Sequence, residues 1–373
     1  MKKTIGVFST KQGHQSIAEA IKEKIEKQAG DRYQVEIFYT KQILEPVYES
    51  LYRLAPSSLK LPYNLTVKMI EKDAELSKLI FKIFLQATYK PSLQFIKEKN
   101  IDLAINCYFP FLPTLEKIQK QLAVSHLNII TDPRTIHPWQ IAPQAYNNFF
   151  FENDSHHHFA KQHRVTISGW FVGEKFEKEY DKEKLRKKLK IKQSLVFLIA
   201  SGSDGSAAIL KILPALINCP NPLHVFIACG NNHALYNNIV GFKKSLKLFS
   251  QSQAVITPLA YTKNMHLYMQ VADLIIGKAG PNTLFESVAT LTPFFAITHI
   301  AQEKGNLEII KEKNLGYVEE KAKEANKKLL DIINHPQQLA KFAKALLELK
   351  QYNQQSSKIL IEEIDKIFKI DKK

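Results

Sequence analysis

One segment of the C-terminal half has residue types that could bind a phosphate group. It begins with an apolar stretch, Leu274–Ile276, which is typical of a buried strand, and a helix is predicted over Asn282–Ala289. Three residues are expected to end the strand: Gly277, Gly280 and Pro281. A glycine-containing turn from a strand into a helix leaves backbone N–H groups at the positive end of the helix, where anions bind. Because Lys278 adds a positive charge, the pattern predicts a phosphate as the ligand.

Side chains that suit a sugar follow this turn. Glu286 lies one turn into the predicted helix, at a distance that suits a sugar diol better than a phosphate. A second strand is predicted at Phe294–Ile297, and the loop after it carries Gln302, Glu303 and Asn306. The whole set suggests a diphosphate with a sugar on either side.

The same residues form two motifs of a known family. Lys-Ala-Gly-Pro-x-Thr-x-x-Glu, followed by Gln-Glu-x-Gly-Asn, resembles the nucleotide-sugar signature of glycosyltransferase family 28. Within that family it is most similar to the monogalactosyldiacylglycerol synthases and the processive diacylglycerol glucosyltransferases. A turn kept only for packing would explain the glycines but not the polar side chains. The resemblance implies that nine residues bind the nucleotide-sugar: Lys278, Ala279, Gly280, Pro281, Thr283, Glu286, Gln302, Glu303 and Asn306.

Other parts of the C-terminal half extend this site. The loop after the apolar run Leu195–Ala200 contains Gly202 and Ser203 and opens into a helix expected from Ala207, so it predicts a second phosphate-binding turn. The resemblance adds three residues near the nucleobase: Gly230, Asn231 and Tyr261. A core position is the alternative for the aromatic ring of Tyr261.

The N-terminal half begins with another strand, turn and helix. A strand is predicted at Thr4–Ser9 and an amphipathic helix at Gln15–Gln28, which places Gly13 and His14 at the carboxyl edge of a parallel sheet. On the residues alone, a histidine here could simply cap the helix. The resemblance implies that Gly13 and His14 face the acceptor and the donor phosphates. The chain has Gln12 where the family usually has a second glycine.

An aspartate is the second candidate for acid–base chemistry. Asp132 follows the strand predicted at Ser125–Ile130, in a Thr-Asp segment that also resembles the lipid galactosyltransferases. We expect Asp132 to lie near His14, across neighbouring strand ends. It would then either orient that histidine or act as the base itself. An aspartate that only caps the following turn is the alternative.

Residues 41–100 depart from the alternation of strands and helices. This segment mixes lysines with bulky apolar residues in helical patterns. Such helices can lie in a membrane interface, or their apolar faces can pack on the N-terminal domain. The resemblance implies that this insertion holds the acceptor and contacts the bilayer.

The composition limits the class of protein. A chain of 373 residues with 45% hydrophobic and 24% charged residues is typical of a soluble protein of two or three domains. None of its three cysteines forms a Cys-x-x-Cys pair, so neither a disulfide framework nor a zinc site is predicted. The N-terminal apolar run is too short for a signal peptide, and no stretch has the roughly 20 apolar residues needed to span a bilayer. We therefore expect a cytoplasmic protein, peripheral on the cytoplasmic face of the membrane.

The net charge of +16 favours an anionic partner. The basic residues are interspersed with acidic ones and no nucleic-acid-binding motif is present, so we expect no nucleic-acid partner. A phosphorylated substrate and an anionic membrane surface fit better. A lysine-rich genome would also produce such a charge without any partner.

Strands and helices alternate in both halves. Strands are predicted at Thr4–Ser9, Tyr33–Tyr39, Ile101–Cys107, Ser125–Ile130, Asn148–Phe151, Leu195–Ala200, His224–Cys229, Ala254–Ile256, Leu274–Ile276 and Phe294–Ile297. With the resemblance, this pattern predicts an α/β fold of the GT-B type, with two Rossmann-like domains facing a central cleft. We expect an acceptor-binding, membrane-associating domain at 1–168, a nucleotide-sugar-binding domain at 169–352, and a C-terminal helix at 353–373 that returns to the first domain.

These features predict an inverting glycosyltransferase that moves a hexose from a UDP-sugar to a membrane lipid such as diacylglycerol. His14 or Asp132 would take the proton of the lipid hydroxyl. The sequence contains no Asp-x-Asp motif, so we expect no metal and no cofactor besides the UDP-sugar donor. Two alternatives remain: an N-acetylglucosaminyltransferase acting on a polyprenyl-linked peptidoglycan precursor, and a sugar-nucleotide-binding protein without turnover.

Overall fold

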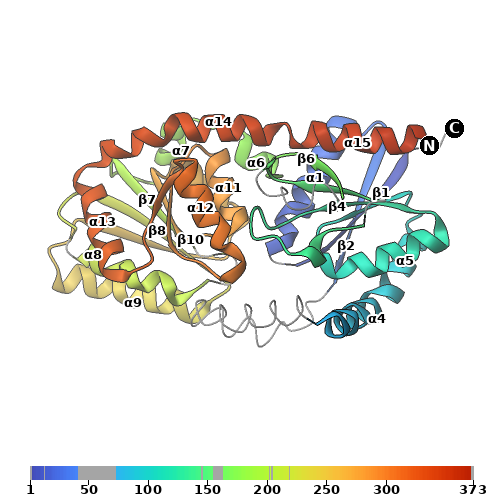
Figure 1. The fold of residues 1–373 in the computed structure, drawn as a ribbon. Helices are drawn as coiled ribbons and strands as arrows, with labels where there is room; N and C mark the ends of the chain where they lie inside the picture. Colours follow the sequence, from blue (N-terminus) through green and yellow to red (C-terminus); the bar gives the residue numbers. More distant parts are fainter. Residues whose placement is uncertain are drawn as a thin grey trace. The chain divides into compact units, whose positions relative to one another are not determined.

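The computed structural model describes residues 2–11, 13–40, 73–143, 146–153, 163–200, 202, 205–217 and 219–370. The described residues form two compact units (Figure 1). Unit 1 contains residues 2–40, 73–174 and 351–370, and unit 2 contains residues 175–350. Each unit is built around one parallel sheet of six strands.

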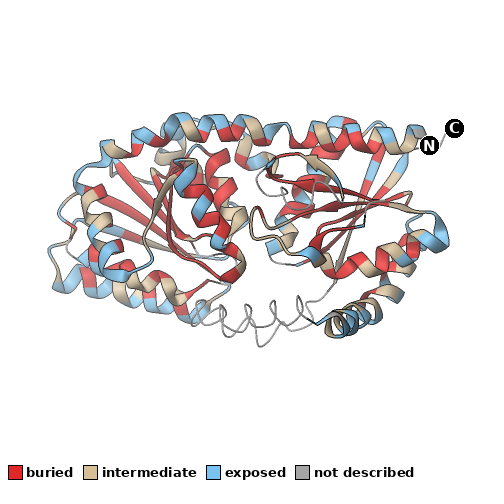
Figure 2. Ribbon diagram, in the orientation of Figure 1, coloured by how far each residue is buried: buried red, intermediate tan, exposed pale blue. Residues whose placement is uncertain are grey.

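The sheet of unit 1 has the strand order β2-β1-β3-β4-β5-β6. Its strands are β1 (Lys3–Thr10), β2 (Tyr33–Thr40), β3 (Leu103–Asn106), β4 (Ser125–Ile129), β5 (Asn147–Phe150) and β6 (Arg164–Ile167). Its helices are α1 (Gly13–Ala29), α4 (Ala74–Glu98), α5 (Leu112–Leu122) and α15 (Ser356–Ile370), with short 3-10 helices η2 (Phe109–Phe111) and η3 (Pro138–Gln140). The inner strands are buried on both faces (Figure 2), which explains why they read as continuous apolar runs.

The C-terminal helix α15 is an integral part of unit 1. The carboxylate of Asp365 accepts hydrogen bonds from the Arg32 guanidinium and the Tyr33 hydroxyl, which lie just before and at the start of β2. The Tyr33 ring stacks on Phe368 with ring centroids 5.6 Å apart, and Gln28 Nε2 donates to Ser357 Oγ at 2.8 Å. Burial raises the pKa of Tyr33, so its hydroxyl keeps the proton that it donates.

The sheet of unit 2 has the strand order β12-β11-β10-β7-β8-β9. Its strands are β7 (Leu195–Ala200), β8 (Leu223–Gly230), β9 (Ala254–Ala260), β10 (Leu274–Lys278), β11 (Phe294–Thr298) and β12 (Gly316–Val318). Strands β8 and β9 are added on one side of β7, and strands β10, β11 and β12 are then added on its other side. The strand order therefore reverses between β7 and β10, and ligands of such sheets bind where the strands end at this switch point.

Helices cover both faces of the unit 2 sheet. They are α7 (Lys182–Lys188), α8 (Leu213–Ile217), α9 (His233–Phe249), α10 (Met265–Val271), α11 (Pro281–Ala289), α12 (Lys304–Glu312) and α13 (Ala322–Asn334), with 3-10 helices η5 (Ala207–Ile212), η6 (Ala301–Glu303) and η7 (Pro336–Phe342). The short helix α6 (Glu174–Glu177) and helix α14 (Ala343–Gln354) each contain a boundary between the units.

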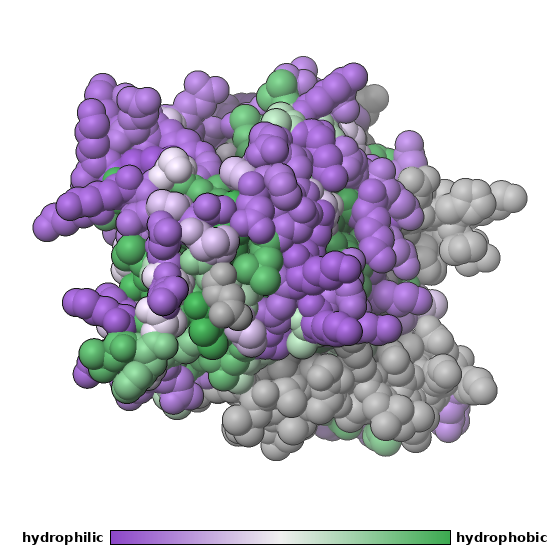
Figure 3. Space-filling view, turned by 90° about the vertical axis from the view of Figure 1, so that its left-hand side faces the viewer, coloured by the Kyte–Doolittle hydropathy of each residue, from purple (hydrophilic) through white to green (hydrophobic). Residues whose placement is uncertain are grey.

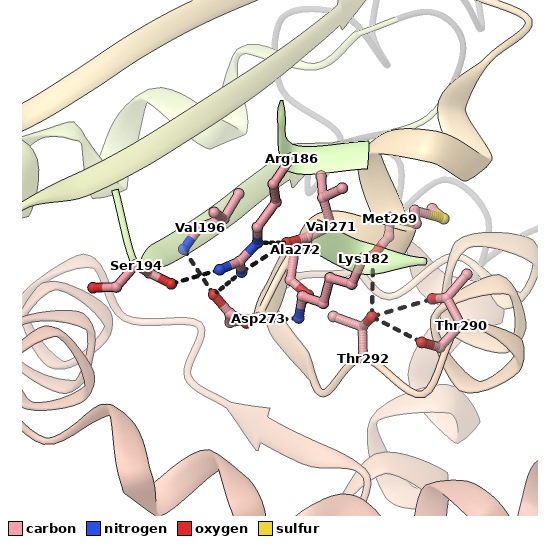
Figure 4. Close-up of polar contacts among 10 residues, drawn as sticks. All are labelled: Lys182, Arg186, Ser194, Val196, Met269, Val271, Ala272, Asp273, Thr290 and Thr292. Atoms are coloured by element: carbon pink, nitrogen blue, oxygen red, sulfur yellow. Dashed lines mark hydrogen bonds and ion pairs between the residues drawn. The ribbon is translucent and has the colours of Figure 1, made fainter. Parts of the chain in front are cut away.

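One aspartate fixes the start of the two switch-point strands (Figure 4). Asp273, directly before β10, accepts hydrogen bonds from Val196 N of β7 at 2.9 Å and from Lys182 Nζ at 2.8 Å. Arg186 Nη2 donates to the same carboxylate at 2.7 Å and to the Val271 carbonyl at 3.0 Å. The charged helix α7 is thereby tied to both strands, so their relative position is fixed at the end away from the switch point.

The strands predicted from apolar runs are all confirmed, within a few residues at their ends. Two short strands, β6 and β12, were missed. The prediction that Gly277 breaks its strand was wrong, because Gly277 lies within β10 and pairs with Ala200 of β7. A Cβ atom on Gly277 would lie 1.7 Å from the Ala200 carbonyl oxygen. This glycine therefore permits the close approach of β10 to β7.

We expect Gly277→Ala to destabilise unit 2 by about 3 kcal/mol, because the backbone of β7 cannot move away from the new methyl group without breaking the sheet. Gly241→Ala is the matched control, since no atom lies within 4 Å of the position of its Cβ atom and it sits inside helix α9. That change should stabilise the protein by about 0.5–1 kcal/mol. Urea unfolding of both variants measures the two effects, and similar values would contradict the close approach.

Candidate functional site

The predicted phosphate-binding turn lies at the switch point of unit 2. Lys278 is the last residue of β10, and α11 begins directly after Gly280. Gly280 is the N-cap of α11 and has no side chain to accept a hydrogen bond from the first N–H groups, and the first turn carries no acidic residue. The positive end of a nine-residue helix is therefore left without a side-chain cap at the place where such sheets bind ligands.

A buried ion pair joins this turn to the second motif. The Lys278 ammonium contacts the Glu303 carboxylate, and their side chains are only 10% and 4% exposed. The other carboxylate oxygen of Glu303 accepts a hydrogen bond from Ile300 N at 2.9 Å. We expected Lys278 to present its full charge to a phosphate, but its charge is balanced by Glu303 in the structure. Its first role is therefore to hold the turn.

Asn306 makes the second link between the motifs. Its Nδ2 donates to the Ala279 carbonyl oxygen at 2.7 Å, so it holds the backbone of the turn between β10 and α11. In the described part of the chain, Asn306 Oδ1 is buried and has no hydrogen-bond partner. An unpaired buried acceptor is rare and is expected where a ligand supplies the donor.

The second motif does not form the loop that we predicted. Gln302 and Glu303 lie in η6 and Asn306 lies in α12, because the chain turns directly from β11 into helical structure. Glu303 and Asn306 point inward and are buried, whereas Gln302 is half-buried. Of the three, only Gln302 is left with appreciable exposed surface.

Glu286 lies in the middle of α11 and is half-buried. Desolvation raises the pKa of its carboxyl to about 8, and the charge of Lys175 only partly opposes this effect. The carboxyl is therefore mostly protonated at neutral pH. A neutral carboxyl can donate one hydrogen bond and accept others, which matches the hydroxyl pair of a sugar.

The loop after β7 supplies the other side of the switch point. Gly202 and Gly205 both have left-handed backbone angles, with φ of 83° and 59°, and a Cβ atom on Gly205 would lie 2.0 Å from the Cys229 carbonyl oxygen. Ser203 falls outside the described residues. The helix expected from Ala207 is the six-residue 3-10 helix η5, capped by Ser206 Oγ, which accepts from Ala208 N at 3.2 Å. The helix predicted from Ala207 is therefore confirmed, as a 3-10 helix, and the phosphate-binding role of the loop before it stays a prediction.

The loop after β8 contacts the loop after β7. Gly230 has a left-handed φ of 58°, and Asn231 is exposed. The next residue, Asn232, links the two loops: its Nδ2 donates to the Gly205 carbonyl at 2.9 Å, and its Oδ1 accepts from Leu235 N and so caps α9. Tyr261 is 55% exposed, which rules out the core position that was the alternative for this ring.

In unit 1, His14 lies in the first turn of α1, after β1, and its ring packs against Tyr108, which follows β3. The two ring centroids are 5.1 Å apart. Burial lowers the pKa of His14 to about 4, and a hydrogen bond with the Cys107 backbone opposes this only partly. In the described residues, His14 Nδ1 is buried and has no hydrogen-bond partner. The imidazole is therefore neutral at physiological pH and can accept a proton. Gly13 is exposed at the start of the same helix.

We expected Asp132 to follow a strand next to the one that precedes His14, but it does not. It follows β4, and β3 separates β4 from β1, so the strands that precede Asp132 and His14 are two positions apart, roughly 10 Å. The ring partner of His14 is Tyr108, and Asp132 accepts a hydrogen bond from Gln140 Nε2 at 2.6 Å. The prediction failed because chain order does not fix strand order. Tyr108 is the residue that sequence reasoning missed.

A buried row of asparagines connects the loops that carry these residues. Asn106, Asn128 and Asn148 lie in register on β3, β4 and β5. Asn106 Nδ2 donates to Asn128 Oδ1 at 2.9 Å, and Asn128 Nδ2 donates to Asn148 Oδ1 at 2.8 Å. At one end Asn106 Oδ1 accepts from Tyr108 N, and in the middle Asn128 Nδ2 also donates to the Gln140 carbonyl. The row therefore positions both the partner of His14 and the partner of Asp132.

Comparison with known families agrees with this arrangement. Residues 196–364 match the glycosyltransferase family 28 C-terminal domain, and residues 14–166 match the monogalactosyldiacylglycerol (MGDG) synthase family. Together the two segments cover most of the chain, which is therefore a glycosyltransferase similar to those of family 28. The first segment contains His14 and Asp132, and the second contains the Lys278 turn.

Curated relatives are distant but extend over most of the chain. A processive diacylglycerol beta-glucosyltransferase of Bacillus licheniformis is 22% identical over 94% of this chain and 91% of its own length. Monogalactosyldiacylglycerol synthase 2 of Arabidopsis thaliana is 24% identical over 84% of this chain and 69% of its own. The chain is thus similar to glycosyltransferases that are named for lipid substrates.

Solved structures share the fold. Acinetobacter baumannii MurG superposes with a TM-score of 0.63 at 15% identity and covers 98% of this chain and 99% of its own. Anabaena Alr3699/HepE, solved in complex with UDP-glucose, has a TM-score of 0.56 at 15% identity over 96% of this chain and 99% of its own. With the two parallel sheets, these likenesses confirm the α/β GT-B fold. No helix among the described residues is long and apolar enough to cross a membrane.

Truncating one member of the Lys278–Glu303 pair should destabilise the enzyme by about 3–5 kcal/mol, because the other charge would stay buried without a partner. Lys278→Met and Glu303→Leu test this singly, and the double variant should recover most of the loss. Lys184→Met is the control, since its ion pair with Asp181 is exposed and contributes below about 1 kcal/mol. Additive losses in the double variant would contradict a direct pairing.

Glu286→Gln should change how stability depends on pH. In the folded enzyme the carboxyl keeps its proton up to about pH 8, whereas the unfolded chain releases it near its ordinary pKa of 4.5. Between these values the unfolded state binds fewer protons, so this group lowers the free energy of unfolding as pH rises. The glutamine variant lacks the effect and should gain stability relative to wild type from pH 5 to pH 8. Urea unfolding at each pH measures the difference, and a constant difference would contradict a raised pKa.

Proposed function

We propose that this glycosyltransferase transfers a hexose from a UDP-sugar to the hydroxyl group of a membrane lipid, with inversion at the anomeric carbon and without a metal ion. The observation that carries the proposal is the pair of links at the switch point, Lys278 with Glu303 and Ala279 with Asn306. They hold the uncapped start of α11 at the place where a diphosphate binds in sheets of this order.

Unit 2 would bind the donor. The N–H groups at the start of α11 and the backbone near Gly202 would bind the diphosphate, and the side chain of Thr283 would add a donor. Glu286 would bind the ribose hydroxyls, and Gly230, Asn231 and Tyr261 would lie by the uracil. Asn306 Oδ1, which is buried without a partner in the described residues, would accept a hydrogen bond from a hydroxyl group of the transferred sugar. Gln302 would bind the same sugar.

Unit 1 would bind the lipid acceptor and supply the base. His14 is neutral at pH 7 and would take the hydroxyl proton as the acceptor oxygen forms its bond to the anomeric carbon. The bond from that carbon to the UDP oxygen breaks in the same displacement, which inverts the configuration. UDP leaves with its charge stabilised by backbone N–H groups. Asp132 is the alternative base, because it is a carboxylate that follows the carboxyl end of β4, where its Oδ2 accepts a hydrogen bond from Gln140 Nε2.

Diacylglycerol is the acceptor that we favour. The relatives that align over most of the chain are named for diacylglycerol glucosylation and for monogalactosyldiacylglycerol synthesis. The described part of α4 carries exposed Leu79 and Ile83 among lysines, which suits contact with a membrane surface. The enzyme would then act as a peripheral protein on the cytoplasmic face of an anionic membrane. Residues 41–72 of the proposed acceptor insertion lie outside the described residues.

The direct test is a transfer assay with the purified full chain and vesicles containing diacylglycerol, in the presence of EDTA. UDP-galactose, UDP-glucose and UDP-N-acetylglucosamine are offered in turn, and the lipids are analysed by mass spectrometry. We expect a hexosyl-diacylglycerol product from one of the first two donors. Product formed only from UDP-N-acetylglucosamine and a polyprenyl-linked precursor would instead support the peptidoglycan activity. UDP binding without any UDP release would support a binding protein.

Two substitutions separate donor binding from proton transfer in that assay. Glu286→Ala should raise the donor KM at least tenfold, because the ribose loses its partner. His14→Ala should lower kcat by roughly 100-fold or more while UDP affinity stays unchanged. If Asp132→Asn abolishes turnover and His14→Ala does not, the aspartate is the base. An unchanged donor KM in Glu286→Ala would contradict the assigned nucleotide site.

A further inference from the structure

Unit 2 has a second surface feature, far from the residues proposed to bind the donor. Helix α9 ends in Leu248 and Phe249, which are 73% and 84% exposed. Ile217, the last residue of α8, and Val255, near the start of β9, are exposed as well. We call these four residues the apolar edge.

The chain brings the four residues to one edge of the sheet. The segment between α9 and β9 is bonded to the end of α8, since Ser252 Oγ donates to the Leu216 carbonyl and Gln253 N donates to the Cys219 carbonyl. This is the edge where strands β8 and β9 begin. In a parallel sheet it is opposite the edge where the strands end, which carries the donor-site residues. The apolar edge is therefore separate from that site.

Leu248 and Phe249 contribute little to the core of unit 2. Helix α9 packs on the sheet through other side chains, which are buried, among them Leu235, Ile239 and Leu246. The remaining outward positions of α9 are mainly polar or small. Two large apolar side chains side by side at the last turn are therefore exposed surface without a packing role.

In the stretch of sequence that forms the apolar edge, the charged side chains are all positive. Lys243, Lys244 and Lys247 are exposed in the last two turns of α9. The sequence contains no aspartate or glutamate from Gly205 to Ala272, so no carboxylate of this stretch offsets the lysines. On the face drawn in Figure 3, apolar side chains project at the lower left from a surface that is otherwise mainly hydrophilic.

We propose that the apolar edge is a membrane contact of unit 2 that inserts Leu248 and Phe249 into the interface of an anionic bilayer. The apolar side chains would enter the boundary between headgroups and acyl chains, while the three lysines bind acidic headgroups. Self-association through this edge is disfavoured because it would bring the lysines of two copies together. This inference rests on the proposed function, because an enzyme with a lipid acceptor must dock on a membrane.

The test is vesicle binding by the full chain without donor or acceptor. Wild-type protein should bind vesicles of phosphatidylcholine with 30% phosphatidylglycerol more tightly than pure phosphatidylcholine vesicles. Leu248→Ser with Phe249→Ser should weaken binding to the anionic vesicles at least tenfold. Replacing the three lysines by glutamine should weaken it by about fivefold per lysine and remove the preference for anionic lipid. Leu347→Ser, which changes an exposed leucine of α14, is the matched control and should bind as wild type does.

A spectroscopic readout makes the contact direct. Phe249→Trp should give a blue-shifted fluorescence difference spectrum against wild type when anionic vesicles are added. Wild-type binding by the double serine variant would overturn the proposal, as would loss of vesicle binding only on changing Leu79 and Ile83 of α4. A concentration-dependent dimer that the serine variant dissociates, with vesicle binding unchanged, would assign the edge to self-association instead. UDP titration of every variant keeps this outcome separate from failure of the proposed glycosyl transfer.

Discussion

The site of unit 2 depends on a buried ion pair that neutralises the lysine expected to bind phosphate. Lys278 is the last residue of β10, and Glu303 lies in η6, which follows the neighbouring parallel strand β11. Asn306 adds a hydrogen bond to the turn between β10 and α11. Two opposite charges are costly to bury, but together they fix a backbone that has no side-chain cap of its own. A turn fixed in this way presents its main-chain N–H groups in one arrangement, which is what the proposed binding of a diphosphate requires.

Unit 1 uses neutral groups for the same purpose. The amides of Asn106, Asn128 and Asn148 satisfy one another across three buried strands and then reach the two loops beyond the sheet. A network in which each amide has partners tolerates burial, and it specifies one register among strands that apolar packing alone would allow to slide. The tilted contact of His14 with Tyr108 follows from that register. One unit thus relies on a charge pair and the other on amides.

The sequence was informative where one property of a segment decides the outcome. The apolar run Leu195–Ala200 predicted a buried strand, and the residues around the end of β10 predicted the turn from strand to helix that the structure shows. It was uninformative where the outcome depends on a partner distant in the chain. Nothing near Lys278 predicts that Glu303 neutralises it, and nothing near Gly277 shows that a carbonyl of β7 approaches it. Strand order was likewise hidden, which is why Asp132 was placed beside the wrong strand. The asparagines in three successive apolar strands were a visible signal that was not used.

The attachment of α15 to unit 1 has a consequence for how the chain is made. The ribosome synthesises the strands of unit 1 first, yet that unit lacks Asp365 and Phe368, the partners of Arg32 and Tyr33, until residues 356–370 have emerged. The described part of unit 2 runs from residue 175 to residue 350 without interruption by unit 1, and its strands are synthesised before α15. The half that is translated second can therefore finish folding first, while the half that is translated first still lacks the helix that packs against α1.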